Sequence, residues 1–295
     1  MDAARHFELH ARGPYSLAAS TRFLEGFAPA TLAPAESDHT HWAFAGDDGA
    51  STVGICLQPR TDGVAVDVFG DDDPGVRDQV ERVLSLDIDG AGFAAVAGRD
   101  PVVAQLQARF PGLRPVLFFT PWEAAAWSAI SHRIRIRQAA VLKARFTREV
   151  GSEVTVHGES RWAFPSPARV LSADQLPGLP ERKAANLRAI AEAALEGALD
   201  AARLRELPPD EALAELKTLP GIGDFYAQLI LVRAVGSPDF LPSAEPRLVR
   251  AVALAYGIDP PAAGELEELA EAWRPFRSWV AFLLRVSLGD ATSTP

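Results

Sequence analysis

One short segment constrains the fold of this chain more than any other feature of its sequence. It reads Leu216-Lys217-Thr218-Leu219-Pro220-Gly221-Ile222-Gly223 and is followed by an apolar run from Asp224. Two glycines around a single aliphatic residue allow a very tight turn, because glycine accepts backbone conformations that other residues avoid. The flanking stretches, 209–216 and 224–235, have helical periodicity. The segment therefore predicts two helices joined by a hairpin.

A hairpin of this kind has a chemical use as well as a structural one. The bare backbone lets amide groups at the N-terminus of the second helix approach a phosphate closely, without basic side chains. We therefore interpret Gly221, Ile222 and Gly223 as contacts to the sugar–phosphate backbone of DNA, which fix position and carry no sequence information. The alternative is a turn whose glycines serve packing alone.

The first 115 residues are typical of a small α+β domain. Asp47-Asp48-Gly49 and Thr61-Asp62-Gly63 are hairpin signals, because Asp-Gly tolerates the positive φ of a tight turn. They separate strand-like runs that precede and follow them. We expect strands at 7–11, 42–45, 52–57 and 64–69, and helices at 17–27, 76–86 and 101–110.

From Thr120 the pattern becomes almost entirely helical. Thr120-Pro121-Trp122-Glu123 combines a capping threonine, a proline at the first helical position and a glutamate at the third. We expect residues 116–295 to form an all-α bundle. The expected helices are 138–150, 168–174, 180–196, 201–207, 209–216, 224–235, 246–256, 262–270 and 276–287.

Composition excludes several classes of protein. Of the 295 residues 48% are hydrophobic, yet no stretch approaches the roughly 18 consecutive apolar residues of a membrane helix. The start of the chain lacks the apolar block of a signal peptide, so we expect a cytoplasmic protein. The single Cys56 excludes a disulfide framework, a four-cysteine iron–sulfur cluster and a zinc site built from cysteines.

Charge is distributed unevenly along the chain. The net charge of −10 argues against a uniformly basic surface that would bind nucleic acid. In residues 116–150 the basic residues outnumber the acidic ones. Charge alone favours a solvated helix face here, and a patch that contacts phosphates needs support from other features of the sequence. The charged residues of this stretch are Arg133, Arg135, Arg137, Lys143, Arg145 and Arg148 against Glu123 and Glu149.

Two further groups of polar residues are candidates for chemistry. Asp38, His39 and His41 are possible metal ligands, but three ligands on one strand with no distant partner are typical of a polar surface. Glu245 precedes Pro246, which suits the first helical position, so its carboxylate is expected at a helix N-terminus. That place favours the ionised form, which can stabilise a cation or polarise water. The alternative is simple helix electrostatics.

These residues resemble a known family, the helix-hairpin-helix DNA glycosylases, and within it the 3-methyladenine DNA glycosylase II (AlkA-like) branch. The resemblance covers most of the chain, and it implies a TATA-box-protein-like domain at 1–115 and a glycosylase bundle at 116–295. The similar segments, in the family's order, are Phe164-Pro165-Ser166-Pro167, Gly178-Leu179-Pro180 with Lys183, Ala193-Ala194-Leu195-Glu196-Gly197, the hairpin, Phe240-Leu241-Pro242, and Trp273-Arg274-Pro275-Phe276-Arg277-Ser278-Trp279.

The resemblance also implies roles for individual residues. Glu245 stands where the family normally has an aspartate that supports loss of the base. Phe225 stands where bifunctional relatives carry a Schiff-base lysine, so a monofunctional enzyme without AP-lyase activity is implied. His132 and Arg133 occupy the place of the loop that enters the minor groove, with Arg135 close by. The remaining implied sites are a base pocket with Trp127, Phe225 and Trp279 as candidates, and a monovalent or alkaline-earth ion on the backbone carbonyls of Leu219 and Ile222.

The leading hypothesis is a base-excision enzyme that flips alkylated purines, of the 3-methyladenine type, out of duplex DNA and hydrolyses their N-glycosidic bond. The resemblance implies no required cofactor, a monomer, and association with the nucleoid of a bacterium. The alternative hypothesis is a DNA-lesion-binding or regulatory protein that retains the fold but has lost efficient chemistry through Glu245 and the His132-Arg133 change. Both predict DNA binding, and a helical protein without a nucleic-acid role does not.

Overall fold

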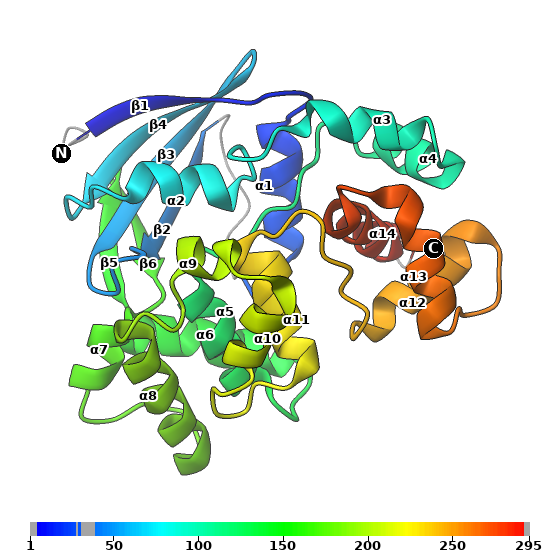
Figure 1. Cartoon of the computed structure of the whole chain (residues 1–295). Helices are drawn as coiled ribbons and strands as arrows, with labels where there is room; N and C mark the ends of the chain where they lie inside the picture. The colour runs from blue at the N-terminus through cyan, green and yellow to red at the C-terminus, as the bar shows by residue number, and fades with distance from the viewer. Residues whose placement is uncertain (1–4, 28, 31–38, 292–295) are drawn as a thin grey trace.

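The computed structural model describes residues 5–27, 29–30 and 39–291 (Figure 1). Its N-terminal part is a four-stranded antiparallel sheet in the order β1-β4-β3-β2. The strands lie within a few residues of the expected runs, and the two Asp-Gly signals fall in the β2–β3 and β3–β4 connections. Their bounds are β1 (Arg5–His10), β2 (Thr40–Ala45), β3 (Thr52–Arg60) and β4 (Gly63–Gly70).

The two faces of this sheet are covered by different parts of the chain. Alternate residues of the strands, such as Phe44, Ile55 and Val66, form one core with helices α1 (Leu17–Gly26) and α2 (Val76–Val83). Successive side chains of a strand point to opposite faces, so Ala43, Cys56 and Phe69 belong to the other face. That face packs against a second, smaller sheet.

The smaller sheet corrects the expectation that residues 116–295 are all-α. Strands β5 (Ser152–Val156) and β6 (Glu159–Ala163) form an antiparallel hairpin that lies against the ends of β2 and β3 (Figure 1). The turn is His157-Gly158, with φ of +46° and +84°. Alternation of Val154 and Val156 with polar residues, before a turn glycine, was the available signal. Helical neighbours on both sides concealed it.

The remaining expected helices of the C-terminal part are present, with ends within two residues of the expected ones in most cases. Thr120 caps α5 as predicted, because its Oγ1 accepts a hydrogen bond of 2.9 Å from the backbone N–H of Glu123. The helices are α5 (Pro121–Ser131), α6 (Ile136–Val150), α7 (Pro167–Ser172), α8 (Glu181–Leu195), α9 (Ala201–Glu206), α10 (Pro209–Leu216), α11 (Asp224–Ile230) with a π-helical extension (Leu231–Val235), α12 (Pro246–Tyr256), α13 (Ala263–Ala270) and α14 (Arg277–Ala291).

Two hydrophobic clusters hold these helices. In the first, every residue of α5 is buried among α6, α8, α10 and α11. In the second, α12 to α14 pack against α3 (Phe93–Ala97), which was not expected, and α4 (Pro101–Arg109). A short 3₁₀ turn precedes each of α3 and α14. The second cluster thus joins residues on both sides of the boundary expected after residue 115, which stays a prediction.

The overall organisation is therefore mixed: a small antiparallel sheet near the N-terminus, followed by a mainly helical part (Figure 1). Among the described residues no helix is long and apolar enough to cross a membrane.

Candidate nucleic-acid interface and carboxylate site

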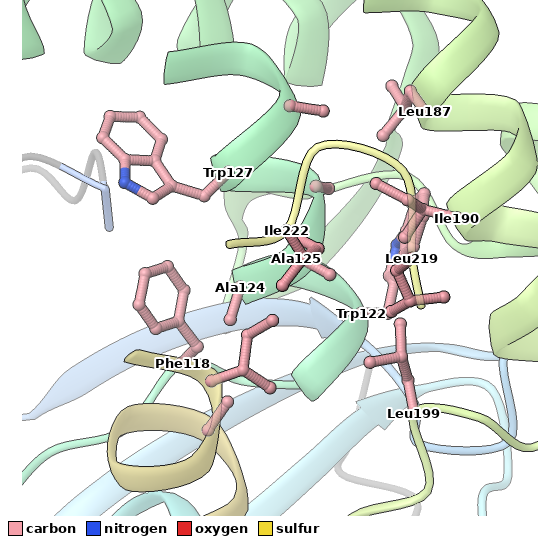
Figure 2. Close-up of a cluster of buried hydrophobic side chains, with 14 of the residues drawn as sticks. Phe118, Trp122, Ala124, Ala125, Trp127, Leu187, Ile190, Leu199, Leu219 and Ile222 are labelled. Atoms are coloured by element: carbon pink, nitrogen blue, oxygen red, sulfur yellow. The ribbon is translucent and has the colours of Figure 1, made fainter. Parts of the chain in front are cut away.

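The glycine-rich segment forms the turn between α10 and α11. Its aliphatic residues, Leu219 and Ile222, are 6% and 5% exposed and point into the first hydrophobic cluster, towards α5 and α8 (Figure 2). Gly221 and Gly223 are exposed, and Gly221 has φ of +83°. A side chain at Gly221 would be strained in that conformation. The sequence therefore anchors the hairpin by its apolar residues and presents its glycine backbone to solvent.

The charges at this hairpin are balanced locally. Asp224 is the first residue of α11, and its carboxylate is 3.0 Å from the Nζ of Lys217. That pairing offsets a negative charge at the helix N-terminus, where an anion would otherwise bind. The carbonyl of Leu219 accepts a hydrogen bond of 3.2 Å from the N–H of Ile222. A cation on these carbonyls stays a prediction.

Glu245 caps helix α12, as its position before Pro246 predicts. One carboxylate oxygen, Oε1, accepts a hydrogen bond of 3.0 Å from the N–H of Arg247, and Oε2 lies 3.5 Å from the Nε of Arg285 on α14. The side chain retains 19% of its exposure. The carboxylate is therefore fixed at two points and still reaches solvent.

The segment that carries Glu245 is also tied to the hairpin. The Oε1 of Gln228, on α11, accepts a hydrogen bond of 2.8 Å from the backbone N–H of Ala244. Through this bond helix α11, which begins at Asp224, positions the residue next to Glu245. A polar residue within an apolar helix was the only sequence signal for Gln228, and sequence analysis missed it.

Two arginines give the carboxylate an unusual setting, also missed at the sequence level. Arg233 is enclosed by aromatic rings, with its guanidinium carbon 5.1 Å from the ring centre of Phe23, 4.7 Å from Phe27 and 5.1 Å from Phe282. Burial, together with the smaller effect of the charge of Arg285, lowers the pKa of Arg233 to about 9, and Glu245 acts in the opposite direction. Burial likewise lowers the pKa of Arg285, against the effect of Glu245.

The turn between α5 and α6 lies beside α11. His132 ends α5, and Arg133 takes a left-handed conformation with φ of +57°, which is unfavourable for a residue with a side chain. The Oγ of Ser131 is 2.9 Å from the hydroxyl of Tyr226 on α11. This hydrogen bond connects the turn to the hairpin. His132 and Arg133 are both exposed.

The structure corrects the size of the basic patch expected in residues 116–150. Lys143 is 2% exposed, and its Nζ is 2.6 Å from the carboxylate of Glu123. Arg145 pairs with Glu149 at 2.6 Å, and Arg148 lies over the ring of Trp162. Counting charges along the sequence does not distinguish these engaged side chains. Arg133, Arg135 and Arg137 remain: each is exposed and, in the described part of the chain, has neither an ion pair nor a contact with an aromatic ring.

The three aromatic pocket candidates are not brought together. Trp127 is 4% exposed and lies near Phe118 within the first cluster (Figure 2). Phe225 is 36% exposed and contacts the ring of Tyr226. Trp279 belongs to the second cluster, 5.2 Å from Phe93.

Surface cavities of about 390 and 460 Å³ lie elsewhere and contact neither the aromatic candidates nor Glu245. The first is lined by residues of the β1–α1 and β3–β4 connections, and the second lies between the end of α6 and the segment that follows α7.

Comparison with known proteins gives a consistent result. No family model matches the chain. It is 25% identical over 210 residues to the DNA-3-methyladenine glycosylase of Bacillus subtilis, covering 70% of this chain and 69% of that protein. It is also 27% identical over 201 residues to the probable bifunctional transcriptional activator/DNA repair enzyme AlkA of Mycobacterium tuberculosis, covering 67% of this chain but 40% of that longer protein.

Solved structures agree on the fold. A 3-methyladenine DNA-glycosylase from Archaeoglobus fulgidus superposes with a TM-score of 0.79 at 24% identity, covering 98% of this chain and 100% of that one. The 3-methyladenine DNA glycosylase Mag1 of Schizosaccharomyces pombe, in complex with abasic DNA, superposes with a TM-score of 0.53 at 19% identity, covering 69% and 99% of the two chains. The chain therefore shares its fold with helix-hairpin-helix DNA glycosylases, and its sequence is similar to the 3-methyladenine and AlkA-like proteins among them.

Proposed function

We propose that this protein is a monofunctional DNA glycosylase, which removes alkylated purines from duplex DNA by hydrolysis of the N-glycosidic bond. The observation that carries the proposal is the place of Glu245: a carboxylate at the N-terminus of α12, on a segment held by the helix of the glycine hairpin. The similarity to 3-methyladenine glycosylases supports the substrate class. In this proposal the N-terminal sheet is the TATA-box-protein-like domain, and the helical part is the helix-hairpin-helix bundle.

DNA would bind along the face formed by the hairpin and the α5–α6 turn. The exposed backbone at Gly221 and Gly223 meets phosphates, and Arg133, Arg135 and Arg137 add charge. Arg133, which the turn holds in a left-handed conformation, fills the space that the flipped nucleotide leaves in the stack. Tyr226 and Ser131 hold the hairpin and the turn in register.

The chemistry then needs one carboxylate and no general acid. A purine alkylated at a ring nitrogen is already a cationic leaving group, so its departure leaves positive charge on the sugar. The carboxylate of Glu245 stabilises this oxocarbenium-like sugar and orients the water that attacks the anomeric carbon. The base leaves neutral with the electron pair of the broken bond, and water supplies the hydroxyl group and releases its other proton to solvent by way of the carboxylate of Glu245.

The lysines of the chain support a reaction without a Schiff base. The sequence has three, and each has a partner: Lys143 pairs with Glu123, Lys183 donates to the carbonyl of Ile130, and Lys217 pairs with Asp224. Phe225 takes the place at the hairpin where a lysine nucleophile would stand.

The decisive test is to incubate purified protein with methylated duplex DNA and to measure released bases by mass and abasic sites in the DNA. Glu245→Gln should abolish release and retain DNA binding. Glu265→Gln is the matched control, because Glu265 also accepts a hydrogen bond at a helix start, from the N–H of Ala262 at 2.8 Å, but lies on α13. Release of bases by Glu245→Gln at the wild-type rate would refute the assignment. Binding without release by the wild type would favour a lesion-binding protein.

A further inference from the structure

The face of the N-terminal sheet that packs against the β5–β6 hairpin carries an unusual set of side chains. His41, Cys56 and Asp67 are direct cross-strand partners on β2, β3 and β4, and His6 of β1 is paired with Asp67. Direct partners on one face have side chains within reach of each other. The sheet register therefore places a row of metal-ligating residue types across all four strands.

Two further histidines complete the group. His39 lies just before β2, with its Nδ1 3.7 Å from the Sγ of Cys56. His157 comes from the β5–β6 turn, where its ring centre is 5.5 Å from that of His41 and its Nε2 is 3.8 Å from Asp67. Ligand atoms of His39, His41 and Cys56 lie within 4.8 Å of one another, and so do those of Cys56, Asp67 and His157. Sequence analysis found no distant partner for His39 and His41. The structure provides two, Cys56 and His157. Asp38, the third residue of that sequence run, lies outside the described residues.

The polar partners of His41 indicate a ligand. Its side chain is 8% exposed, and its Nδ1 is 3.0 Å from the carboxylate of Glu159. Its other nitrogen, Nε2, is buried and has no hydrogen-bond partner in the structure. A buried polar atom without a partner is costly. A histidine that binds a metal through one ring nitrogen usually donates the other N–H to a carboxylate, which is the arrangement of Glu159 and His41.

We propose that this cluster binds one zinc ion, or a similar divalent transition-metal ion, through His39, His41, Cys56 and His157. A tetrahedral ion with ordinary Zn–S and Zn–N bonds holds sulfur and nitrogen about 3.5 Å apart, close to the 3.7 Å between Cys56 and His39. Binding displaces the thiol proton of Cys56 into solvent. The thiolate neutralises one of the two positive charges of the ion, and the nearby carboxylates of Asp67 and Glu159 compensate the other.

The backbone and the surroundings fit this assignment. His157 has φ of +46°, a conformation that a non-glycine residue adopts when its surroundings hold it there. Cys56 is fully buried beside Ala43 and Val156, so the apolar contact between sheet and hairpin shields the site on one side. The ion would connect strands β2 and β3 to the β5–β6 hairpin, and its role is to hold this hairpin on the sheet.

The test uses the full chain, purified without a histidine tag, stripped of metal by a chelator and then titrated with Co²⁺ or Zn²⁺. We expect one equivalent of bound metal, tetrahedral Co²⁺ bands with a thiolate charge-transfer band, and a higher melting temperature with Zn²⁺. Cys56→Ser should lose the thiolate charge-transfer band. His41→Gln should no longer bind one equivalent of metal. His10→Gln is the control, because His10 pairs with Asp62 on the same sheet, outside the cluster.

A second pair of variants keeps the test decisive if a buried substitution prevents folding. Glu159 and Glu153 are both exposed carboxylates of the β5–β6 hairpin, but only Glu159 contacts His41. Glu159→Gln should weaken metal affinity about 10- to 100-fold, and Glu153→Gln should leave it unchanged. Equal affinities in the two variants, or Co²⁺ binding without a thiolate band in the wild type, would overturn the proposal and leave a hydrogen-bonded cluster only.

Discussion

Removing Arg133, Arg135 and Arg137 together should lower the salt dependence of DNA binding by a calculable amount. Each phosphate contact of a basic side chain contributes about 0.9 to the slope of log affinity against log salt concentration. Three exposed arginines without an ion pair in the described residues therefore predict a slope that is smaller by about 2.7 in the triple alanine variant. Between 50 and 200 mM salt, the wild type should lose about 40-fold more affinity than the variant.

The assay is fluorescence anisotropy of a labelled duplex with a stable abasic analogue, titrated at several salt concentrations. Arg145→Ala is the matched control, because Arg145 is also exposed on α6 but is engaged with Glu149 at 2.6 Å. Its slope should change by less than the value of about 0.9 that one phosphate contact contributes. Two results would contradict the assignment of the DNA face to the α5–α6 turn. The triple variant could keep the wild-type slope, or Arg145→Ala could lower the slope as much as each of the three arginines does.

Three further predictions concern the helical part. Lys143→Met should reduce the free energy of unfolding in urea by about 3 to 5 kcal/mol, because it leaves Glu123 buried without its partner; adding Glu123→Gln should restore most of the loss. Gln228→Ala should lower single-turnover base release about fivefold, the equivalent of about 1 kcal/mol for its bond to Ala244, with DNA affinity unchanged; reduced affinity would contradict a positioning role. Gly221→Ala should cost about 1 kcal/mol of stability because of its φ of +83°, and thermal unfolding without a loss would contradict the strained conformation.

The sequence predicted the elements whose limits are set by local signals. Helix α12 begins at Pro246 and ends before Gly257, which has φ of +65°, so both of its limits are encoded by the residues at its ends. The hairpin β5–β6 has no comparable local stability, because its apolar residues, Val154 and Val156, gain their burial only against the larger sheet. The hairpin depends on tertiary packing, which local sequence patterns do not reveal.

The same distinction applies to the residues of the candidate site. The place of Glu245 at a helix N-terminus was predicted because a proline follows it, and the cap it forms is local. Gln228, Arg233 and Arg285 were not found, because each acts across the interior on a residue far away in the sequence. The row that includes Cys56 depends on strand register, which fixes cross-strand neighbours only once the sheet is assembled.

The glutamate in place of the family's aspartate is best understood together with its surroundings. A side chain with one more methylene has more rotational freedom, and a misplacement of about 1 Å costs much of the rate in a reaction of this kind. In this chain both carboxylate oxygens of Glu245 are engaged, Oε1 by the N–H of Arg247 and Oε2 by Arg285. These two contacts remove the freedom that the extra methylene adds. In the reaction that we propose, Arg285 also brings a positive charge close to the cationic sugar, because it lies beside Glu245, and this charge opposes the stabilisation by Glu245. Replacement of Arg285 by a neutral residue would therefore release both the restraint and the opposing charge, and the direction of the change in rate would show which of the two effects is larger.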